Sequence, residues 1–398
     1  MGMITSEIEG HLERQSWIRR MFEAAAELKA QHGADNVYDF SLGNPDVPAP
    51  PAVAAALREL ADQAQEPKFF GYVPNAGLPS LRAKLAERVA AEQGVNVDSS
   101  QIIVACGAAG ALNALFRAIL NPGDEVLCPA PYFVEYGFYV GNYKGILKTV
   151  PTTDSFDPDL EQMEAAISSR TRAVLINSPN NPTGRVYSSE TLASLANLLQ
   201  KKSREFGHPI LLISDEPYRF LAYDNTEVPP VLSQYKASLV VSSFSKSLSL
   251  AGARIGYLAV HPDMPERDKL LAGVTMTNRV LGFVNAPIIG QRLIEKVLDC
   301  GVDTTIYDER RHAMAALLDS AGLQYVMPKG AFYFFPRCPE GCDDKQFAAE
   351  LLKQKVIAVP GSGFGRANHL RLTYCVDGST IQGARDSFLR AIEAANQA

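Results

Sequence analysis

Tryptophan, histidine and cysteine are scarce in this chain of 398 residues, which has one tryptophan, six histidines and six cysteines. The histidines form no cluster, so each is expected to be structural or exposed. Cys338 and Cys342 flank a Pro-Glu-Gly turn, but no second Cys or His pair completes a zinc site. The sequence therefore predicts no metal site, and it predicts reduced thiols rather than a disulfide framework.

Long apolar runs and basic runs are also absent. No apolar run approaches the roughly 20 residues that a membrane-spanning helix needs. Residues 1–20 mix Glu, His and Arg and lack the apolar core of a signal peptide. The net charge of −6 gives no sign of a nucleic-acid surface. We therefore expect a soluble cytoplasmic protein that binds neither membrane nor nucleic acid.

The centre of the chain alternates short apolar segments with helical ones, which is typical of an α/β fold with a mostly parallel sheet between helices. After residue 286, helices and short strands predict a smaller α+β domain. The length suggests two or three domains. The central strands are expected at residues 102–104, 125–128, 173–176, 210–213, 239–241 and 255–260, and the main helices at 15–31, 52–66, 78–93, 107–120, 189–206, 286–319 and 380–396.

Four of these strands run into small or polar residues. In an open parallel sheet, ligands bind in the crevice beyond the carboxyl ends of the strands. One site would thus receive a carboxylate, a phenol, a lysine, hydroxyls, an amide and a helix N-terminus. The residues are Asp215 and Tyr218, then Ser243, Ser245 and Lys246, then Asn181, and finally Gly107, Ala108 and Ala109.

Pyridoxal 5′-phosphate (PLP) requires this combination of groups. A lysine amine forms an imine with its aldehyde, and a carboxylate keeps the pyridine nitrogen protonated so that the ring accepts electrons. The phosphate needs backbone N–H donors at a helix N-terminus, together with hydroxyls and a cation. The sequence therefore predicts a PLP site.

Several motifs resemble those of one enzyme family. The segment Ser243-Phe244-Ser245-Lys246, with Gly252-Ala253-Arg254-Ile255-Gly256 after it, resembles the lysine signature of the class I/II aminotransferases of PLP fold type I, a family that includes the aspartate aminotransferases. The resemblance covers roughly residues 40–380. Further blocks in family order are Gly71-Tyr72, Asn181-Pro182-Thr183-Gly184, Asp215-Glu216-Pro217-Tyr218, Gly361-Ser362-Gly363-Phe364-Gly365 and Leu370-Arg371-Leu372.

The resemblance implies a large PLP-binding domain and a smaller α+β domain. Residues 1–44 would form an N-terminal arm and part of the small domain. Residues 45–285 would form the large domain, and residues 286–398 the rest of the small one. The working unit would be a homodimer with shared active sites.

The resemblance also implies roles in holding the cofactor. Lys246 would carry it as a Schiff base and move the substrate's α-proton, and Asp215 would pair with the ring nitrogen. Tyr218 and Asn181 would bind the ring oxygen, and Tyr132 would stack on the ring. Phosphate would bind Ser243, Ser245, Arg254 and the backbone of Gly107, Ala108 and Ala109, with Tyr72 reaching the neighbouring subunit's phosphate.

For the substrate, the resemblance implies that Arg371 grips the α-carboxylate through a bidentate fork. Gly43 and Asn181 would also lie at the substrate. Arg279 would reach the partner subunit's site and select dicarboxylates, although its spacing to Asn285 is one residue longer than in dicarboxylate-specific relatives.

The sequence departs from the family in two places. The phosphate loop Gly-Ala-Ala-Gly at 107–110 lacks the hydroxyl that some relatives carry. The stacking position is Tyr132, where the aspartate aminotransferases of animals and enteric bacteria have tryptophan, and the only tryptophan here is Trp17. This argues against that subgroup.

Each residue also has a simpler interpretation. Asp215 could be a helix N-cap, and Arg371 and Arg279 could be ordinary surface charges. Tyr132 could only pack in its aromatic-rich segment, and Asn181-Pro182 could be a turn.

The expected function is a PLP-dependent aminotransferase that moves the amino group of an L-amino acid to a 2-oxo acid such as 2-oxoglutarate. A lyase that eliminates a β- or γ-substituent, for example by C–S cleavage, would use the same lysine, aspartate and arginine. A non-catalytic PLP-binding regulator is disfavoured because Lys246 is intact. The sequence leaves the amino donor open.

Overall fold

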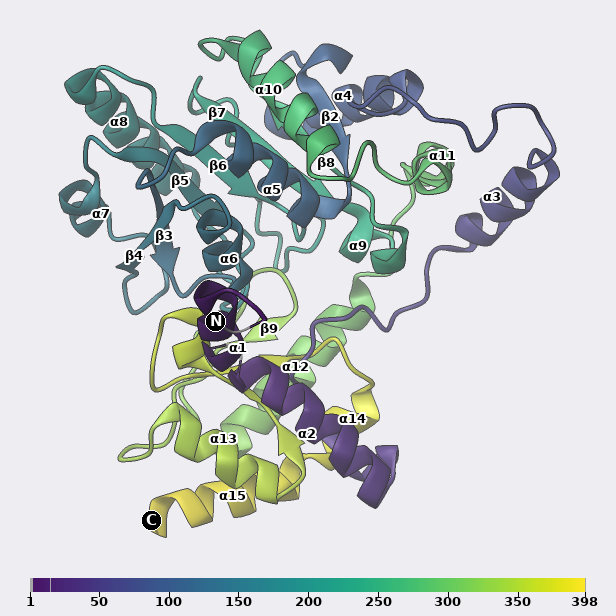
Figure 1. Ribbon diagram of the computed structural model, residues 1–398. Coiled ribbons are helices and arrows are strands. Elements are labelled where there is room, and N and C mark those ends of the chain that lie inside the picture. Colours follow the sequence, from purple (N-terminus) through teal and green to yellow (C-terminus); the bar gives the residue numbers. More distant parts are fainter. Residues whose placement is uncertain (1–2, 15, 398) are drawn as a thin grey trace.

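The computed structural model describes residues 3–14 and 16–397, and a seven-stranded sheet forms its centre (Figure 1). All strands run parallel except β8, which is antiparallel to both of its neighbours. In spatial order the strands are β2 (Ile102–Ala105), β8 (Gly256–Val260), β7 (Ser238–Ser243), β6 (Leu211–Asp215), β5 (Thr171–Asn177), β3 (Glu125–Ala130) and β4 (Ile146–Pro151).

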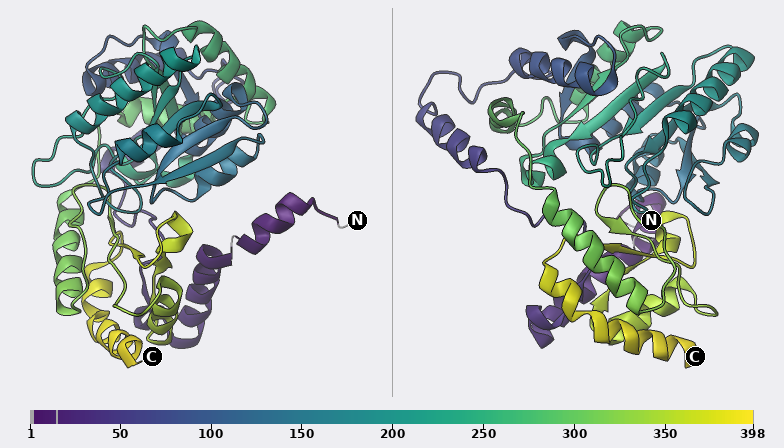
Figure 2. Two further views of the ribbon diagram at one scale, coloured as in Figure 1. Left: turned by 90° about the vertical axis from the view of Figure 1, so that its left-hand side faces the viewer. Right: turned by 180° about the vertical axis from the view of Figure 1, so that it is seen from behind.

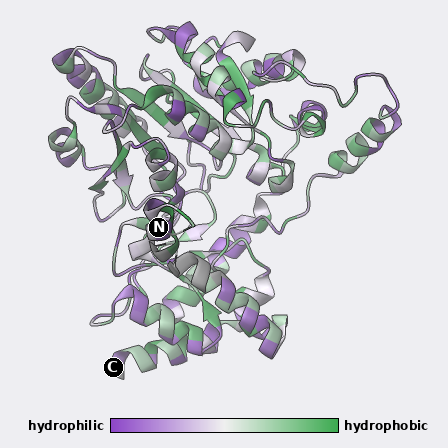
Figure 3. Ribbon diagram, viewed as in Figure 1, coloured by the Kyte–Doolittle hydropathy of each residue, from purple (hydrophilic) through white to green (hydrophobic). Residues whose placement is uncertain are grey.

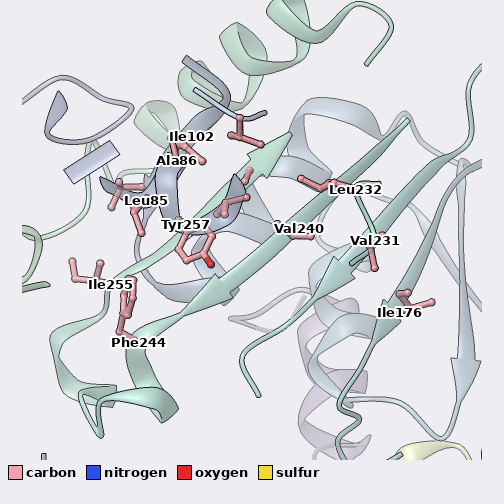
Figure 4. Close-up of a cluster of buried hydrophobic side chains, with 14 of the residues drawn as sticks. Leu85, Ala86, Ile102, Ile176, Val231, Leu232, Val240, Phe244, Ile255 and Tyr257 are labelled. Carbon is pink, nitrogen blue, oxygen red and sulfur yellow. The ribbon is translucent and has the colours of Figure 1, made fainter. Parts of the chain in front are cut away.

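Successive strand residues point to opposite sides of this sheet, and helices cover both of its faces. Leu212 and Val240 belong to one buried apolar cluster, part of which is drawn in Figure 4. Ile213 and Leu239, their neighbours along the chain, belong to a second cluster on the other face. Strands buried on both faces are continuously apolar, and Figure 3 shows this hydropathy along the ribbon.

The first cluster includes side chains of α4 (Pro79–Gln93) and α8 (Ser189–Phe206), and the second includes side chains of α5 (Gly107–Ile119) and α10 (Arg267–Val280). The parallel sheet places the carboxyl ends of β5, β6 and β7 side by side. Loops that follow these strands therefore meet at one edge of the sheet.

A second body of structure joins the two ends of the chain. Strand β1 (Tyr38–Asp39) pairs in parallel with β10 (Val356–Ile357). A three-stranded sheet contains β11 (Val359–Pro360), β12 (Leu370–Thr373) and β9 (Tyr333–Phe334). Phe40 packs in the same buried cluster as residues of the C-terminal third. The exact domain boundaries at 44/45 and 285/286 stay a prediction.

The remaining helices are α1 (Ser6–Arg14), α2 (Ser16–His32), α3 (Pro51–Asp62), α6 (Glu135–Gly141), α7 (Leu160–Ala166), α9 (Phe244–Ser247), α11 (Ile288–Val297), α12 (Thr305–Ser320), α13 (Asp344–Lys353), α14 (Gly378–Gly383) and α15 (Arg385–Gln397). Helix α1 projects away from the rest of the chain (Figure 2). Trp17 lies in α2, and its side chain is outside the described part of the structure.

The predicted elements differ from the structure mainly at exposed positions. The helix expected over 52–66 ends at Asp62, and the one expected over 286–319 divides into α11 and α12. Strand β4 was not predicted because most of its residues are partly or fully exposed at the sheet edge, so it lacks a continuous apolar run. Helices α6, α7, α10 and α13 were also not identified.

All six cysteines are free thiols. Across residues 3–14 and 16–397, no three His, Cys, Asp or Glu side chains gather in a way that could hold a metal ion. In the same residues no helix has both the length and the apolar character needed to cross a membrane.

Candidate active site

A cavity of about 440 Å³ lies where the loops after the parallel strands meet the second body of structure. Its walls come from strand ends, from α6 and from the segments around Gly43, Tyr333 and Arg371. The lining residues include Ala108, Ala109, Phe133, Glu135, Tyr136, Tyr139, Asn177, Asn181, Asp215, Tyr218, Ser243, Ser245, Lys246 and Arg254.

Asp215 is the last residue of β6, and only 5% of it is exposed. Tyr136 donates a hydrogen bond of 2.6 Å from its hydroxyl to Asp215 Oδ2, while Oδ1 is buried without a partner among the described residues. Burial raises the pKa of the Asp215 carboxyl to about 7, although the Tyr136 hydrogen bond acts to lower it. An unpaired buried carboxylate is costly, so this oxygen is suited to a cationic N–H donor.

The neighbouring carboxylate, Glu216, faces away from this cavity. It accepts hydrogen bonds from Gln93 at 3.0 Å and Ser214 at 2.8 Å, and it pairs with Arg219 at 3.1 Å. The alternation along the strand therefore gives one acid a complete set of partners and leaves the other open to the cavity.

Lys246 lies in the short helix α9, directly after β7. Its Nζ donates to the carbonyl oxygen of Gly43 at 2.6 Å and lies 5.7 Å from the centre of the Phe332 ring. Within the described residues it has no ion pair with a carboxylate. Burial lowers the pKa of the amine to about 8, so a neutral nucleophilic amine forms more readily than in an ordinary lysine.

The N-terminus of α5 and Arg254 form a second polar part of the cavity. A Cβ at Gly107, where φ is +72°, would lie 2.7 Å from Arg254 Nη2, so a side chain here would displace the guanidinium. Ser243 and Ser245 also line the cavity. Helix N–H groups, hydroxyls and a guanidinium together provide the donors that a phosphate group needs.

An amide network connects the ends of β5 and β6. Asn177 donates from Nδ2 to the carbonyl oxygen of Asp215 at 2.7 Å, and its Oδ1 accepts from the backbone N–H of Asn181 at 2.7 Å. Tyr218 lies beside them, with its hydroxyl 2.9 Å from that of Tyr333. Burial raises the pKa of Tyr218 well above its ordinary value, so the phenol stays protonated.

Arg371, on β12, brings a buried guanidinium to the cavity. It donates from Nη1 to Asn181 Oδ1 at 3.3 Å and from Nη2 to the carbonyl oxygen of Ser41. The rings of Tyr333 and Phe364 lie 5.0 and 4.7 Å from its Cζ. Its Nε has no partner among the described residues, and burial lowers its pKa. A buried, unpaired guanidinium is suited to a carboxylate ligand.

A family comparison matches the model described as "Aminotransferase class I and II" over residues 35–388. The chain belongs to the class I and II aminotransferases. It is therefore a transaminase that transfers amino groups between amino acids and 2-oxo acids, and members of this family use PLP.

Individual relatives agree with this assignment. The chain is 34% identical to an aspartate/prephenate aminotransferase of Thermus thermophilus, over 92% of this chain and 94% of that one. It is 32% identical to an asparagine–oxo-acid transaminase of Streptococcus mutans, over 90% and 92% of the two chains. A crystal structure of an amino transferase from Eubacterium rectale superposes with a TM-score of 0.94 and 38% identity, over 99% and 100% of the two chains.

The residues of this aminotransferase fit PLP. The open oxygen of Asp215 suits a protonated ring nitrogen, and the corner formed by α5 and Arg254 suits a phosphate. Lys246 supplies an amine that no carboxylate holds within the described residues. The three groups lie in one cavity, as their positions after three different strands predicted.

Most of the predicted site residues of the aminotransferase line this cavity. The structure brings together Gly43, Ala108, Ala109, Asn181, Asp215, Tyr218, Ser243, Ser245, Lys246, Arg254 and Arg371. Gly107 lies just behind the lining, against Arg254.

Tyr132, predicted as the stacking residue, is not among the lining residues, and the next residue, Phe133, is. The Tyr132 ring packs beside Gly365, and the Tyr132 N–H donates to the carbonyl oxygen of Phe364 at 3.0 Å. The backbone therefore directs the Tyr132 ring toward the 361–365 loop, and Phe133 takes its place in the cavity lining.

Tyr72 and Arg279 also lie outside the cavity of their own chain. Tyr72 is 92% exposed in the segment before α4. Arg279 is exposed in the last turn of α10. Their predicted roles need a second subunit.

The sequence prediction missed Phe133, Glu135, Tyr136, Tyr139 and Tyr333. The first four belong to α6 or to the loop before it. The sequence indicates only an aromatic-rich segment there. The spacing of Phe133, Tyr136 and Tyr139, three residues apart, is the helical signal that places them on one face.

Proposed function

We propose that this aminotransferase carries PLP on Lys246 and uses one cavity for both half-reactions, from an L-amino acid to a 2-oxo acid such as 2-oxoglutarate. The observation that carries the proposal is that the cavity holds two ionisable groups, Asp215 and Lys246, and neither has an opposite charge beside it among the described residues. Asp215 Oδ1 has no partner among the described residues, and the Lys246 amine is held only by a carbonyl oxygen.

PLP, when bound, supplies a ring that accepts the electrons left when the substrate's α-proton is removed. Asp215, whose Oδ1 is open, would hold the proton on the ring nitrogen. Tyr136 keeps this carboxylate oriented by its 2.6 Å hydrogen bond and favours its charged form. Asn181 and Tyr218 would donate to the ring oxygen, and Phe133 would take the stacking role predicted for Tyr132.

Arg371 binds the substrate α-carboxylate, for which its buried Nε is open. The rings of Tyr333 and Phe364 hold the guanidinium in place. Lys246 Nζ would take the proton from the substrate α-carbon and would deliver it to the cofactor. The low pKa of its amine, about 8, favours the proton-accepting form.

Gly43 supports this arrangement through its backbone. Its carbonyl oxygen accepts from Lys246, and a Cβ at this residue would collide with the Tyr333 hydroxyl. The small residue therefore lets Tyr333 approach the substrate side of the cavity.

We also propose a homodimer in which Tyr72 and Arg279 act in the partner's site. Asn75 donates to the carbonyl oxygen of Val284 at 2.8 Å, so the segment that carries Tyr72 lies beside the segment after α10. The segment before α4 and helix α10 both carry exposed apolar side chains, and an exposed apolar surface is typical of an interface. They are Phe70 (63% exposed), Tyr72, Met276 (58%) and Val280 (57%).

We retain residues 1–44 and 286–398 as the small domain and residues 45–285 as the large one. The shared cluster that contains Phe40 and the C-terminal residues supports this division. The six free cysteines fit a reducing compartment such as the cytoplasm.

The test uses the PLP-loaded enzyme and a panel of amino acids without an oxo-acid acceptor. We expect one equivalent of oxo acid per site, with loss of the absorbance of bound PLP, and recovery when 2-oxoglutarate is added. Lys246→Ala should abolish this half-reaction, because the anchor and the proton carrier are the same amine. Lys201→Ala, in the exposed part of α8, serves as the matched control.

Two results would contradict the proposal. Continued product formation without an acceptor would indicate an eliminating lyase. Wild-type rates in Lys246→Ala would remove the lysine from the mechanism.

A further inference from the structure

Five charged side chains line the cavity, and four have a partner in the proposed reaction. Lys246 would bind the cofactor aldehyde, and Arg254 would bind the phosphate. Asp215 would bind the ring nitrogen, and Arg371 the substrate α-carboxylate. The fifth is Glu135, which has no opposite charge beside it among the described residues of its own chain.

Glu135 is the first residue of α6, and it is half-buried in the cavity wall. Throughout the described chain, its carboxylate has neither an ion pair nor a hydrogen bond. Tyr139 lies one turn later on the same wall. Burial and the charge of Glu135 both raise the pKa of the Tyr139 phenol. Burial likewise raises the pKa of Glu135 itself. A partly desolvated carboxylate in this position favours a positively charged or N–H donor ligand.

The location of Glu135 identifies which part of the substrate it would meet. The α-carbon must lie near Lys246 Nζ, and the α-carboxylate must lie at Arg371. We infer that the side chain of the amino acid extends toward α6, whose first residue, Glu135, lines the same cavity. A second carboxylate on the substrate would there face a like charge, which costs binding free energy unless a cation intervenes.

We propose that Glu135 sets the specificity of this aminotransferase for amino acids whose side chain ends in a nitrogen donor, either an amide or an ammonium group, over the corresponding dicarboxylic acids. The inference rests on the proposed function and narrows its substrate class. The ionised Glu135 accepts a hydrogen bond from the side-chain nitrogen and repels a side-chain carboxylate.

The first measurement compares kcat/KM of the PLP-loaded enzyme for asparagine and glutamine, for lysine and ornithine, and for aspartate and glutamate. The wild type should prefer an amide or an ammonium substrate over the dicarboxylic acids by about tenfold or more. The comparison of asparagine and glutamine with lysine and ornithine shows whether an amide or an ammonium group is preferred. Glu135→Gln, which keeps the shape and removes the charge, should reduce this preference by about tenfold, mainly by raising kcat/KM for aspartate and glutamate.

Glu190→Gln is the matched control, since Glu190 is exposed in the first turn of α8 and lies outside the cavity. It should leave the preference unchanged. An equilibrium measurement removes any dependence on turnover: succinamate should bind the wild type more tightly than succinate, by calorimetry, and Glu135→Gln should reduce the difference.

An unchanged preference in Glu135→Gln would overturn the inference. A wild-type preference for aspartate that Arg279→Ala abolishes would also overturn it, because Arg279 of the partner subunit would then set specificity. If no amino acid in the panel alters the absorbance of bound PLP, the proposed function itself fails, and succinamate and succinate binding still tests Glu135 separately.

Discussion

Lys246 donates its hydrogen bond to the carbonyl oxygen of Gly43, and Asp215 receives one from the Tyr136 hydroxyl. Neither has an opposite charge beside it within the described residues, although Asp215 is buried and Lys246 is partly buried. Burial therefore acts on their pKa values with little compensation, and it shifts both toward the neutral range. At the scale of single residues, this shift favours the neutral amine of Lys246 and leaves the Asp215 carboxylate in need of a cationic partner.

The pH dependence of cofactor attachment tests the Lys246 environment. Only the neutral amine attacks the PLP aldehyde, so the rate of attachment to the cofactor-free protein should rise with pH and level off above about pH 8. An ordinary lysine would give a rise that continues to about pH 10. The rate is measured by stopped-flow absorbance after mixing with PLP, and a profile centred near pH 10 would contradict the environment described.

Tyr136→Phe tests the support of Asp215. The variant keeps the ring, which meets the Phe133 ring edge-on at 5.5 Å, but loses the hydrogen bond to the carboxylate. A hydrogen bond to a charged group contributes about 1.5–3 kcal/mol, so PLP should bind more weakly by a comparable free energy. The pKa of Asp215 should rise further, because its charged form loses a donor.

The measurement is the dissociation constant of PLP from equilibrium titration, with Tyr143→Phe as the matched control outside the cavity. Equal affinities of wild type and Tyr136→Phe would show that the hydrogen bond does not support the cofactor site.

At the scale of elements, the end of β6 directs two adjacent acids to different surroundings. Asp215 and Glu216 differ by one position, yet one reaches the cavity and the other reaches Gln93, Ser214 and Arg219. The parallel pairing of β6 with β5 sets Asp215 opposite Asn177, whose amide binds the Asp215 carbonyl oxygen. The strand register thus determines which acid serves the cofactor and which serves the fold.

Matched substitutions of the last residue of β6 and of the residue after it should therefore have different effects. Asp215→Asn should weaken PLP binding and slow the half-reaction strongly, while the cofactor-free protein keeps or gains stability because an unpaired buried carboxylate is removed. Glu216→Ala should lower the free energy of unfolding by about 3–5 kcal/mol, because it leaves buried partners unsatisfied. Thermal and denaturant unfolding of the cofactor-free proteins, together with PLP titration, separates the two effects.

The sign of the pH effect gives a further check on Asp215. Its pKa is raised from an ordinary value of about 3.9 to about 7 in the folded, cofactor-free protein. The unfolded chain releases this proton first, so the Asp215 contribution makes the folded state less stable as pH rises from about 4 to 7. Asp215→Asn should remove this part of the pH dependence, and an unchanged profile would contradict the raised pKa.

At the scale of the whole molecule, the described chain leaves two predicted site residues outside its own cavity. Tyr72 and Arg279 are exposed, and apolar side chains surround the segments that carry them. Helix α1, which projects from the rest of the chain in Figure 2, adds the exposed apolar residues Ile8 and Leu12, and Ile4 precedes it. A two-fold symmetric pair would bury such surfaces and bring Tyr72 to the partner's phosphate.

Hybrid dimers test this arrangement. Lys246→Ala and Tyr72→Ala chains, each strongly impaired alone, should recover activity when co-expressed with different tags, because each hybrid contains one site with both native residues. Random pairing of equal amounts should restore about one quarter of the native sites. A fully active monomer in sedimentation, or no recovery in purified hybrids, would contradict the shared site.

The sequence by itself determined the family, the cofactor and the strand-end residues that gather around it. Those residues follow apolar strands whose pattern is local, and parallel pairing then carries every strand end to the same edge. Lys246, Asp215 and Asn181 could thus be identified without any coordinates, whereas Arg254 was identified through the family resemblance. The structure brings all four into one cavity.

Only the tertiary structure decided what each side chain meets. It placed Phe133 rather than Tyr132 at the cavity and paired Tyr136 with Asp215, because the path of α6 depends on packing between distant segments. It also left Glu135 without a partner among the described residues. Hydrogen bonds and unpaired charges are relations between residues far apart in the chain, and local periodicity contains no information about them.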